Sequence, residues 1–176
     1  MPHTAIFEQW LPLPVERVFE FFANPENLPR IMPRWMQVGV DNAVLFAPPD
    51  APRDKRFAGE GSVITVSFRP VPLLPLRVRS EARIVGFEMN RFFEDAHSDA
   101  LFKSWHHRHE FAAEERGDIA GTSARDVITY ELRFGALSPL VNSLFVAPQM
   151  LRTFEYRQKE VAHLLRPTIP IFDSES

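Results

Sequence analysis

The sequence predicts an α+β fold in which a strongly curved antiparallel sheet of about six to seven strands covers one long C-terminal helix. Two observations predict the sheet and the helix. Segments between residues 4 and 132 alternate with the period of a strand, or are rich in β-branched and aromatic residues. After Gly135 the apolar period changes to three or four residues. A sheet with one apolar face and a helix with one apolar face can bury these faces by packing against each other.

The N-terminal part predicts one strand and two short helices. Residues 4–10 alternate as a strand does, and two prolines then end it. Apolar residues recur at helical spacing over 15–22, with charged residues opposite. Asn24-Pro25 ends this helix and begins a second one over 26–31. We expect the two short helices to close one end of the sheet.

The middle of the chain predicts a series of strands with one long loop. Residues 47–58 carry three prolines and several charges, which is typical of a loop. The segments with strand character are 35–46, 62–68, 76–87, 89–97, 102–111 and the stretch that ends at Leu132.

The last two of these strands form a hairpin whose turn sets its register. Gly117-Asp118 suits a two-residue turn, because glycine supplies the positive φ that it requires. This turn places His109 opposite Asp126, and Trp105 opposite Tyr130. A glycine at position 121 also allows a longer, asymmetric loop. A slip of one residue would scatter these side chains between the two faces.

The predicted register gathers a polar group on the face that carries Trp105 and Phe111. His107, His109, Asp126 and Tyr130 share this face and lie close enough across the strands to interact. A structural network is one interpretation: Asp126 orients His109, and Tyr130 bonds a backbone carbonyl. Recognition of a ligand's polar group is the second. Acid–base catalysis is the third, with His107 or His109 as base, Asp126 as its orienter and Tyr130 as proton donor.

No metal and no cofactor are expected from the sequence. The His-x-His pair plus Asp126 offers two imidazoles and a carboxylate, but one such pair without other paired ligands is a weak signal. His106 falls on the outer face. The length of the loop before Phe102 decides whether Asp95 or Glu94 shares the inner face, and the sequence leaves both possibilities open.

The C-terminal helix is predicted to begin at Ser138, with Pro139 in its first turn. Its apolar stripe contains Leu140, Leu144, Ala147, Leu151, Phe154, Val161 and Leu165, and Gln158 is the one polar residue in that stripe. Pro148 should kink or restart the helix. The stripe is either core or the wall of a pocket. The residues expected to line a ligand site are Trp105, His107, His109, Phe111, Ile128, Tyr130, Leu144, Leu151 and Phe154.

Composition excludes several classes of protein. A net charge of −3 without a basic stripe argues against nucleic acid as a partner. The absence of cysteine excludes disulfides, thiolate zinc sites and cysteine nucleophiles. No apolar run predicts membrane insertion, and the N-terminus is unlike a signal peptide, so we expect a cytoplasmic protein. At 176 residues we expect one domain over 1–166, followed by a loose tail over 167–176.

The order of elements and several motifs resemble the START and birch-pollen-allergen-like superfamily (SRPBCC), within it the polyketide cyclase/dehydrase-like bacterial branch. The most specific motif is the run from Trp105 to Phe111. The others are Pro14 to Phe19, Asn24 to Pro29 with Pro33, Phe93-Glu94-Asp95, Phe102, Asp126, Tyr130, Phe134-Gly135, and Phe145 to Arg157. The branch often has Gln-x-x-Gly-Pro before the aromatic residue at 102, where this chain has His97, Ala100 and Leu101.

The resemblance implies the helix-grip fold and a cavity between sheet and helix that holds an apolar small molecule. We therefore expect a carrier or sensor of a lipid-like or polyketide-like compound. One alternative is an enzyme of the cyclase or dehydratase type that uses the His107, His109, Asp126 and Tyr130 group. Another is a domain that acts through protein partners and has a vestigial pocket. The sequence does not indicate an oligomeric state.

Overall fold

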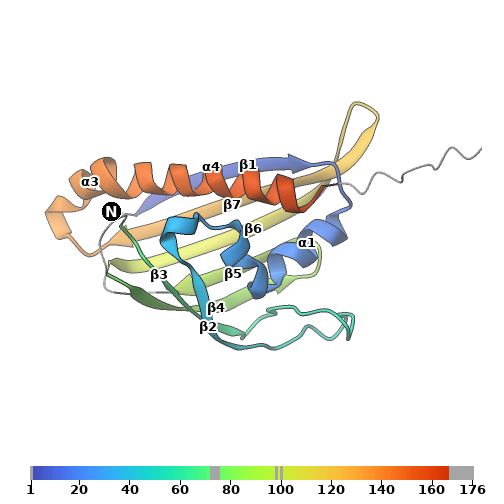
Figure 1. Ribbon diagram of the computed structural model, residues 1–176, viewed down its shortest axis with the longest axis horizontal. Coiled ribbons are helices and arrows are strands. Elements are labelled where there is room, and N and C mark those ends of the chain that lie inside the picture. The colour runs from blue at the N-terminus through green and yellow to red at the C-terminus, as the bar shows by residue number, and fades with distance from the viewer. Residues whose placement is uncertain (1, 72–75, 98, 100, 167–176) are drawn as a thin grey trace, which may run out of the picture.

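The computed structural model describes residues 2–71, 76–97, 99 and 101–166, and these form one antiparallel sheet with helices on one side (Figure 1). The sheet has seven strands in the order β1-β7-β6-β5-β4-β3-β2. The strands are β1 (His3–Leu11), β2 (Gly39–Val44), β3 (Val63–Phe68), β4 (Val78–Glu88), β5 (Phe92–His97), β6 (Phe102–Arg116) and β7 (Ile119–Leu132). Because β1 pairs with β7, the first and last strands of the chain are neighbours.

The helices divide the covered face between them (Figure 1). The long α4 (Ala147–Leu164) runs along β1 and β7, and α1 (Val15–Ala23) packs on β6 and β7 towards the other end. The short elements that follow α1 are the 3-10 turn η1 (Pro25–Asn27), the helix α2 (Leu28–Ile31) and the 3-10 turn η2 (Arg34–Met36). Before α4 come the 3-10 turn η3 (Gly135–Leu137), the helix α3 (Ser138–Val141) and the π-helical turn η4 (Asn142–Val146).

The α+β fold class predicted from the sequence is confirmed, and so is the β6–β7 register. His109 pairs with Asp126 and Trp105 with Tyr130. Gly117 has φ 61°, as the first central residue of a type II′ turn requires. A longer loop at Gly121 does not form, because Gly121 is itself in β7 and pairs with Glu114.

Gly121 has a packing role in this pairing. A Cβ atom built there would lie 2.5 Å from the carbonyl oxygen of Leu11 and 2.5 Å from the ring of Trp10. The indole nitrogen of Trp10 donates a hydrogen bond to the carbonyl of Glu114, 3.1 Å away. The missing side chain therefore lets β1 fold tightly over the base of the hairpin.

The core consists of two apolar clusters on the covered face. One surrounds Phe19 of α1, whose ring meets those of Phe87, Phe93 and Phe111 edge-on. The other lies under α4 and comprises Ile128, Tyr130, Leu132, Met150 and Phe154.

Two sequence predictions for local structure are wrong. The segment 35–46 begins with the turn η2, and its strand covers only Gly39–Val44. The apolar stripe of the C-terminal helix is wrong in its first half: Leu140, Leu144 and Leu151 are 56%, 59% and 50% exposed, whereas Phe154, Val161 and Leu165 are buried as predicted.

The buried face of α4 does not include Leu151, which lies one residue after the buried Met150 and so points about 100° away from it around the helix. A π turn contains one more residue than an α turn, so η4 rotates the residues before α4 relative to those within it. Pro148, in the first turn of α4, lacks the N–H that an α-helix would bond to the carbonyl of Leu144. The departure from α-helical hydrogen bonding therefore lies next to Pro148, while the backbone stays helical through it. The helix face that meets the sheet contains Met150, Thr153, Phe154, Arg157 and Val161.

The predicted tail over 167–176 lies outside the described residues. None of the helices in the described part of the chain combines the length and the hydropathy that a membrane crossing needs.

We expect Gly121→Ala to destabilise the protein by about 1–3 kcal/mol, because the added methyl group overlaps the Leu11 carbonyl and the Trp10 ring. Urea unfolding measures this change. Gly39→Ala is the matched control in the same sheet: the atom nearest to its new methyl group would be the flexible end of Arg77, at 3.4 Å, and no backbone atom is among its three nearest neighbours. Equal losses in the two variants would contradict the tight β1–β7 contact.

We expect Phe154→Ala to cost about 3–5 kcal/mol, because it empties a buried position between α4 and the sheet. Leu151→Ala, one turn earlier on the same helix, should change the free energy of unfolding by less than about 0.5 kcal/mol. Denaturant unfolding of both variants tests the face that α4 presents. Comparable large losses in both variants would place Leu151 on the buried face together with Phe154, as the stripe predicted from sequence spacing does.

Candidate functional site

Four acidic and imidazole side chains meet on the covered face of the sheet. Asp95 comes from β5, His107 and His109 from β6, and Asp126 from β7. The register pairs Asp95 with His107, and His109 with Asp126. Side chains of directly paired residues point to the same face, so two strand pairings bring all four together.

Asp126 contacts both imidazole rings through one oxygen atom. His107 Nε2 lies 3.0 Å from Asp126 Oδ1 in an aligned hydrogen bond. His109 Nδ1 lies 2.5 Å from the same oxygen, but the oxygen is off the direction of the ring N–H, so no aligned hydrogen bond forms. The two rings are 3.9 Å apart between centroids. Of the four predicted catalytic residues, the structure brings these three together.

Asp95 is the group whose face the sequence left open, and the structure places it on the covered side with Phe93. Its Oδ2 is 3.7 Å from His107 Nδ1 and 3.9 Å from His109 Nε2. These separations are too long for direct hydrogen bonds. Each imidazole thus has one nitrogen next to Asp126 and the other directed towards Asp95.

The electrostatics of this group follow from its burial. Burial lowers the pKa of His109 to about 3, with His107 adding to the shift and Asp126 opposing it. Burial alone would raise the pKa of Asp126, but His109, Arg157 and the hydrogen bond from His107 hold it well below its usual range. Burial raises the pKa of Asp95, against the opposing influence of His107 and His97. At neutral pH the group therefore contains a neutral His109 and an ionised Asp126.

Arg157 of α4 is a functional candidate that the sequence reasoning missed. Its side chain is buried, and its guanidinium lies 5.5 Å from the ring centroid of Phe22 and 5.2 Å from that of Phe154. Its positive charge lowers the pKa of both Asp95 and Asp126. Gln158, which the sequence placed in the stripe, instead donates a hydrogen bond to the carbonyl of Glu8. Arg157 and Gln158 are consecutive residues of α4, and a spacing of three or four residues from Phe154 fits either of them, so apolar spacing alone does not choose between them.

Aromatic rings pack closely around the imidazoles. Phe93 stacks on His109 with centroids 4.3 Å apart, and Phe154 meets His107 edge-on at 5.8 Å. His107 and His109 are only 6% and 5% exposed. The polar group is therefore a layer between the two apolar clusters.

Tyr130 belongs to a different polar group, beyond the second apolar cluster. Its hydroxyl donates to Asn142 Oδ1 at 2.6 Å, whereas a backbone carbonyl was the expected partner. Asn142 Nδ2 in turn lies 3.3 Å from His3 Nδ1. Among the described residues, no hydrogen bond links Tyr130 to His107 or His109.

An aromatic cluster surrounds Tyr130 at the end of the sheet where β6 begins. Trp105 lies 5.8 Å from Tyr130 and 4.8 Å from Phe102 between ring centroids, and His97 stacks on Trp105 at 5.3 Å. His97 Nδ1 and His3 Nε2 are buried and have no hydrogen-bond partner within the described part of the chain. We call His3, His97, Phe102, Trp105 and Tyr130 the aromatic end.

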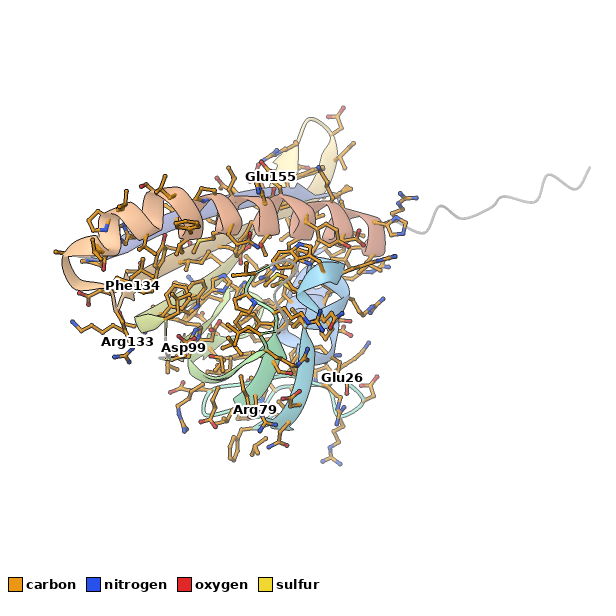
Figure 2. All side chains as sticks on the ribbon, turned by 60° about the vertical axis from the view of Figure 1, so that its left-hand side comes forward. Glu26, Arg79, Asp99, Arg133, Phe134 and Glu155 are labelled. Carbon is orange, nitrogen blue, oxygen red and sulfur yellow. The ribbon has the colours of Figure 1, made fainter. Side chains whose placement is uncertain are left out.

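The connection from β5 to β6 is held next to the aromatic end. Asp99 Oδ1 accepts from the backbone N–H groups of Leu101 and Phe102, at 2.8 Å each. Arg133 Nε donates to the Asp99 carbonyl at 2.7 Å. Figure 2 shows Asp99, Arg133 and Phe134 close together at this end, below the start of the helix.

Of the nine residues predicted to line a ligand site, His107 and His109 belong to the polar layer, and the other seven fall into three places. Trp105, Ile128, Tyr130 and Phe154 pack in one cluster under α4. Phe111 is in the other cluster, against Phe19. Leu144 and Leu151 lie on the exposed side of the helix, so the expectation that they face the sheet is wrong. Figure 2 shows Glu155 also projecting from the outer side of α4.

The interior group has the donor set of a metal site. Asp95, His107 and His109 each offer a ligand atom, and these atoms lie within 4.8 Å of one another. Two surface hollows lie elsewhere. One is between η2 and α4, lined by residues that include Trp35, Arg152 and Tyr156, and the other is near Pro25 and Arg56.

Comparison with known proteins supports the fold. No protein-family model matches the sequence, and no curated protein does. The protein TTHA0849 from Thermus thermophilus is 18% identical with TM-score 0.60, over 92% of this chain and 95% of that one. Major latex-like protein 151 from Panax ginseng is 13% identical with TM-score 0.63, over 94% and 99%. The di-domain ARO/CYC BexL of the BE-7585A biosynthetic pathway is 16% identical with TM-score 0.60, over 96% of this chain and 51% of that one.

At these identities the similarity shows the fold alone. The chain has the helix-grip fold, which confirms the predicted resemblance to the START and birch-pollen-allergen-like superfamily at the level of architecture.

Tyr130 should make the free energy of unfolding depend on pH in the alkaline range. Burial raises its pKa, although the hydrogen bond to Asn142 opposes this. As the pH rises past about 10, the unfolded Tyr130 therefore loses its proton before the folded one, so stability is full below that pH and falls above it. Tyr130→Phe should cost about 1 kcal/mol at neutral pH and decline less steeply above about pH 10. Chemical unfolding across this pH range measures both effects. If the stabilities of the unmodified protein and of Tyr130→Phe declined in parallel, Tyr130 would not be the group that causes the pH dependence.

Proposed function

We propose that this protein binds a small, mainly apolar molecule between the sheet and α4 at the aromatic end, as a carrier or sensor. The observation that carries the proposal is the composition of this end. Trp105 and Phe102 are only partly buried, and they lie next to two buried imidazole nitrogens without partners in the described residues. Apolar pockets usually combine such surfaces with a few fixed polar groups.

The polar groups indicate what the ligand carries. Tyr130 and Asn142 already satisfy each other, and Asn142 fixes the position of His3. The free atoms are His97 Nδ1 and His3 Nε2, on opposite sides of the ring pair formed by Trp105 and Tyr130. A hydroxyl or carbonyl group on an otherwise apolar compound would supply a partner for either. The ligand class that fits is therefore a hydrocarbon or polycyclic body with one or two oxygen functions.

The fold similarity supports the same class in a coarser way. One structural neighbour is described as an ARO/CYC di-domain of a biosynthetic pathway, and it shares this architecture over nearly the whole of the present chain. An apolar aromatic compound is thus compatible with the architecture.

The geometry favours binding over acid–base catalysis by the predicted set of four. His107 and His109 are packed beneath Phe154 and Phe93, and His107 meets the aromatic end only through an edge-on contact with the ring of Trp105 at 6.4 Å. The hydroxyl of Tyr130 is committed to Asn142. A proton donor and a base acting on one substrate must both reach it.

Displacement of an apolar fluorescent dye tests the proposal. We expect saturable binding of the dye, and a loss of affinity of at least about tenfold in Trp105→Ala, because this change removes the largest apolar surface of the aromatic end. Native mass spectrometry of the protein purified from its own host should show a bound mass that Trp105→Ala loses.

Trp35→Ala is the matched control. Trp35 is also partly buried, but it lines the hollow between η2 and α4. The affinity of the Trp35→Ala variant for the dye should match that of the unmodified protein. A loss in Trp35→Ala without a loss in Trp105→Ala would place the apolar site in that hollow and contradict the proposal.

A further inference from the structure

The arrangement of the two imidazoles around Asp95 and Asp126 is specific. With His107 Nε2–H donating to the ionised Asp126, the lone pair of a neutral His107 is on Nδ1. His109 presents Nδ1 to the same carboxylate, so its lone pair is on Nε2. Both lone-pair nitrogens are the atoms nearest to Asp95, at 3.7 and 3.9 Å.

We propose that Asp95, His107 and His109 bind one divalent transition-metal ion of the Zn²⁺ or Fe²⁺ class, and that Asp126 is the carboxylate that orients both imidazoles. The proposal is independent of the apolar ligand, because it concerns the buried polar layer and not the aromatic end.

The separations between the donor atoms fit this assignment. Two ligands of a tetrahedral zinc ion, each about 2.0–2.2 Å from the metal, are about 3.3–3.5 Å apart. The observed gaps of 3.7 and 3.9 Å between Asp95 and the imidazoles need a contraction of only a few tenths of an ångström. The two imidazole donor nitrogens lie within 4.8 Å of each other, so a bound ion must also draw the two rings together. The same gaps are too wide for hydrogen bonds, so in the described structure Asp95 makes no direct hydrogen bond with either ring.

The position of Asp126 also fits. In histidines that bind metals, the N–H of the other ring nitrogen usually donates a hydrogen bond to a carboxylate. This hydrogen bond fixes the tautomer and the orientation of the ring. Here one carboxylate serves two rings. His109 Nδ1, in a side chain that is 5% exposed, has a close neighbour in Asp126 but no aligned hydrogen bond. A small rotation of the ring towards a bound ion would change that alignment.

The chemistry of the donors selects the kind of metal. Two imidazoles and one carboxylate suit zinc, iron(II) and cobalt(II), whereas calcium and magnesium prefer all-oxygen sites. Three protein ligands leave at least one position open for water or another small ligand. The neutral imidazole is the form that binds metal.

Titration of the untagged, metal-free protein with Co²⁺ and Zn²⁺ tests the proposal. We expect one ion per chain, visible absorption bands of low-symmetry Co²⁺, and a Zn²⁺-dependent rise in the unfolding temperature. Asp126→Asn should weaken binding about 10–100-fold, as loss of an orienting carboxylate does. Asp95→Asn and His109→Gln should weaken it more, because each removes a ligand.

His106→Gln is the matched control. His106 precedes His107 on the same strand, but its side chain is on the outer face, where it contacts Glu94. This variant should bind Co²⁺ and Zn²⁺ as the unmodified protein does. An equal loss in His106→Gln, or no saturable binding of one ion per chain, would overturn the proposal.

A second measurement covers variants that fail to fold. In the unmodified protein loaded with Co²⁺, imidazole protons of coordinated histidines have strongly shifted NMR signals. Two coordinated imidazoles would support the site, and signals from none would overturn it.

Discussion

The pairing of β6 with β7 is the constraint on which the rest of the structure depends. A two-residue turn with a positive φ at Gly117 fixes this register over the whole hairpin. Because side chains alternate with period two, a slip of one residue would turn both imidazoles of β6 outwards and bring Arg108 and Glu110 into the core. The same hairpin pairs with β1 on one side and β5 on the other, so its register positions both apolar clusters and the polar layer between them.

The polar layer is unfavourable for folding unless its groups compensate each other. Buried charges lose their hydration, and a buried pair stabilises a protein only when its geometry satisfies both partners. Asp126 meets this condition through its contacts with two imidazoles and the nearby charge of Arg157. Asp95 does so less completely, since its nearest ring nitrogens are beyond hydrogen-bond distance.

The face that α4 turns towards the sheet decides which side chains complete the interior. Phe154 and Arg157 are buried on this face, whereas Leu151, which lies between them and Ala147 in the same helix, is on the outside. The π turn before α4 begins with Asn142, which accepts a hydrogen bond from the hydroxyl of Tyr130. This local departure from α-helical geometry therefore contributes to the aromatic end.

The sequence by itself determined the order of elements, the α+β architecture and the pairing of His109 with Asp126, because period-two alternation and glycine turn chemistry are local properties of the chain. It left the position of Asp95 open, because a shift of one residue in the preceding loop inverts the face. It misjudged Leu144 and Leu151 and made no prediction for Arg157, because apolar residues three or four positions apart do not define which face of the helix meets the sheet. Which polar atoms end up beside one another was decided only by the tertiary structure, because packing three strands and a helix together sets those distances.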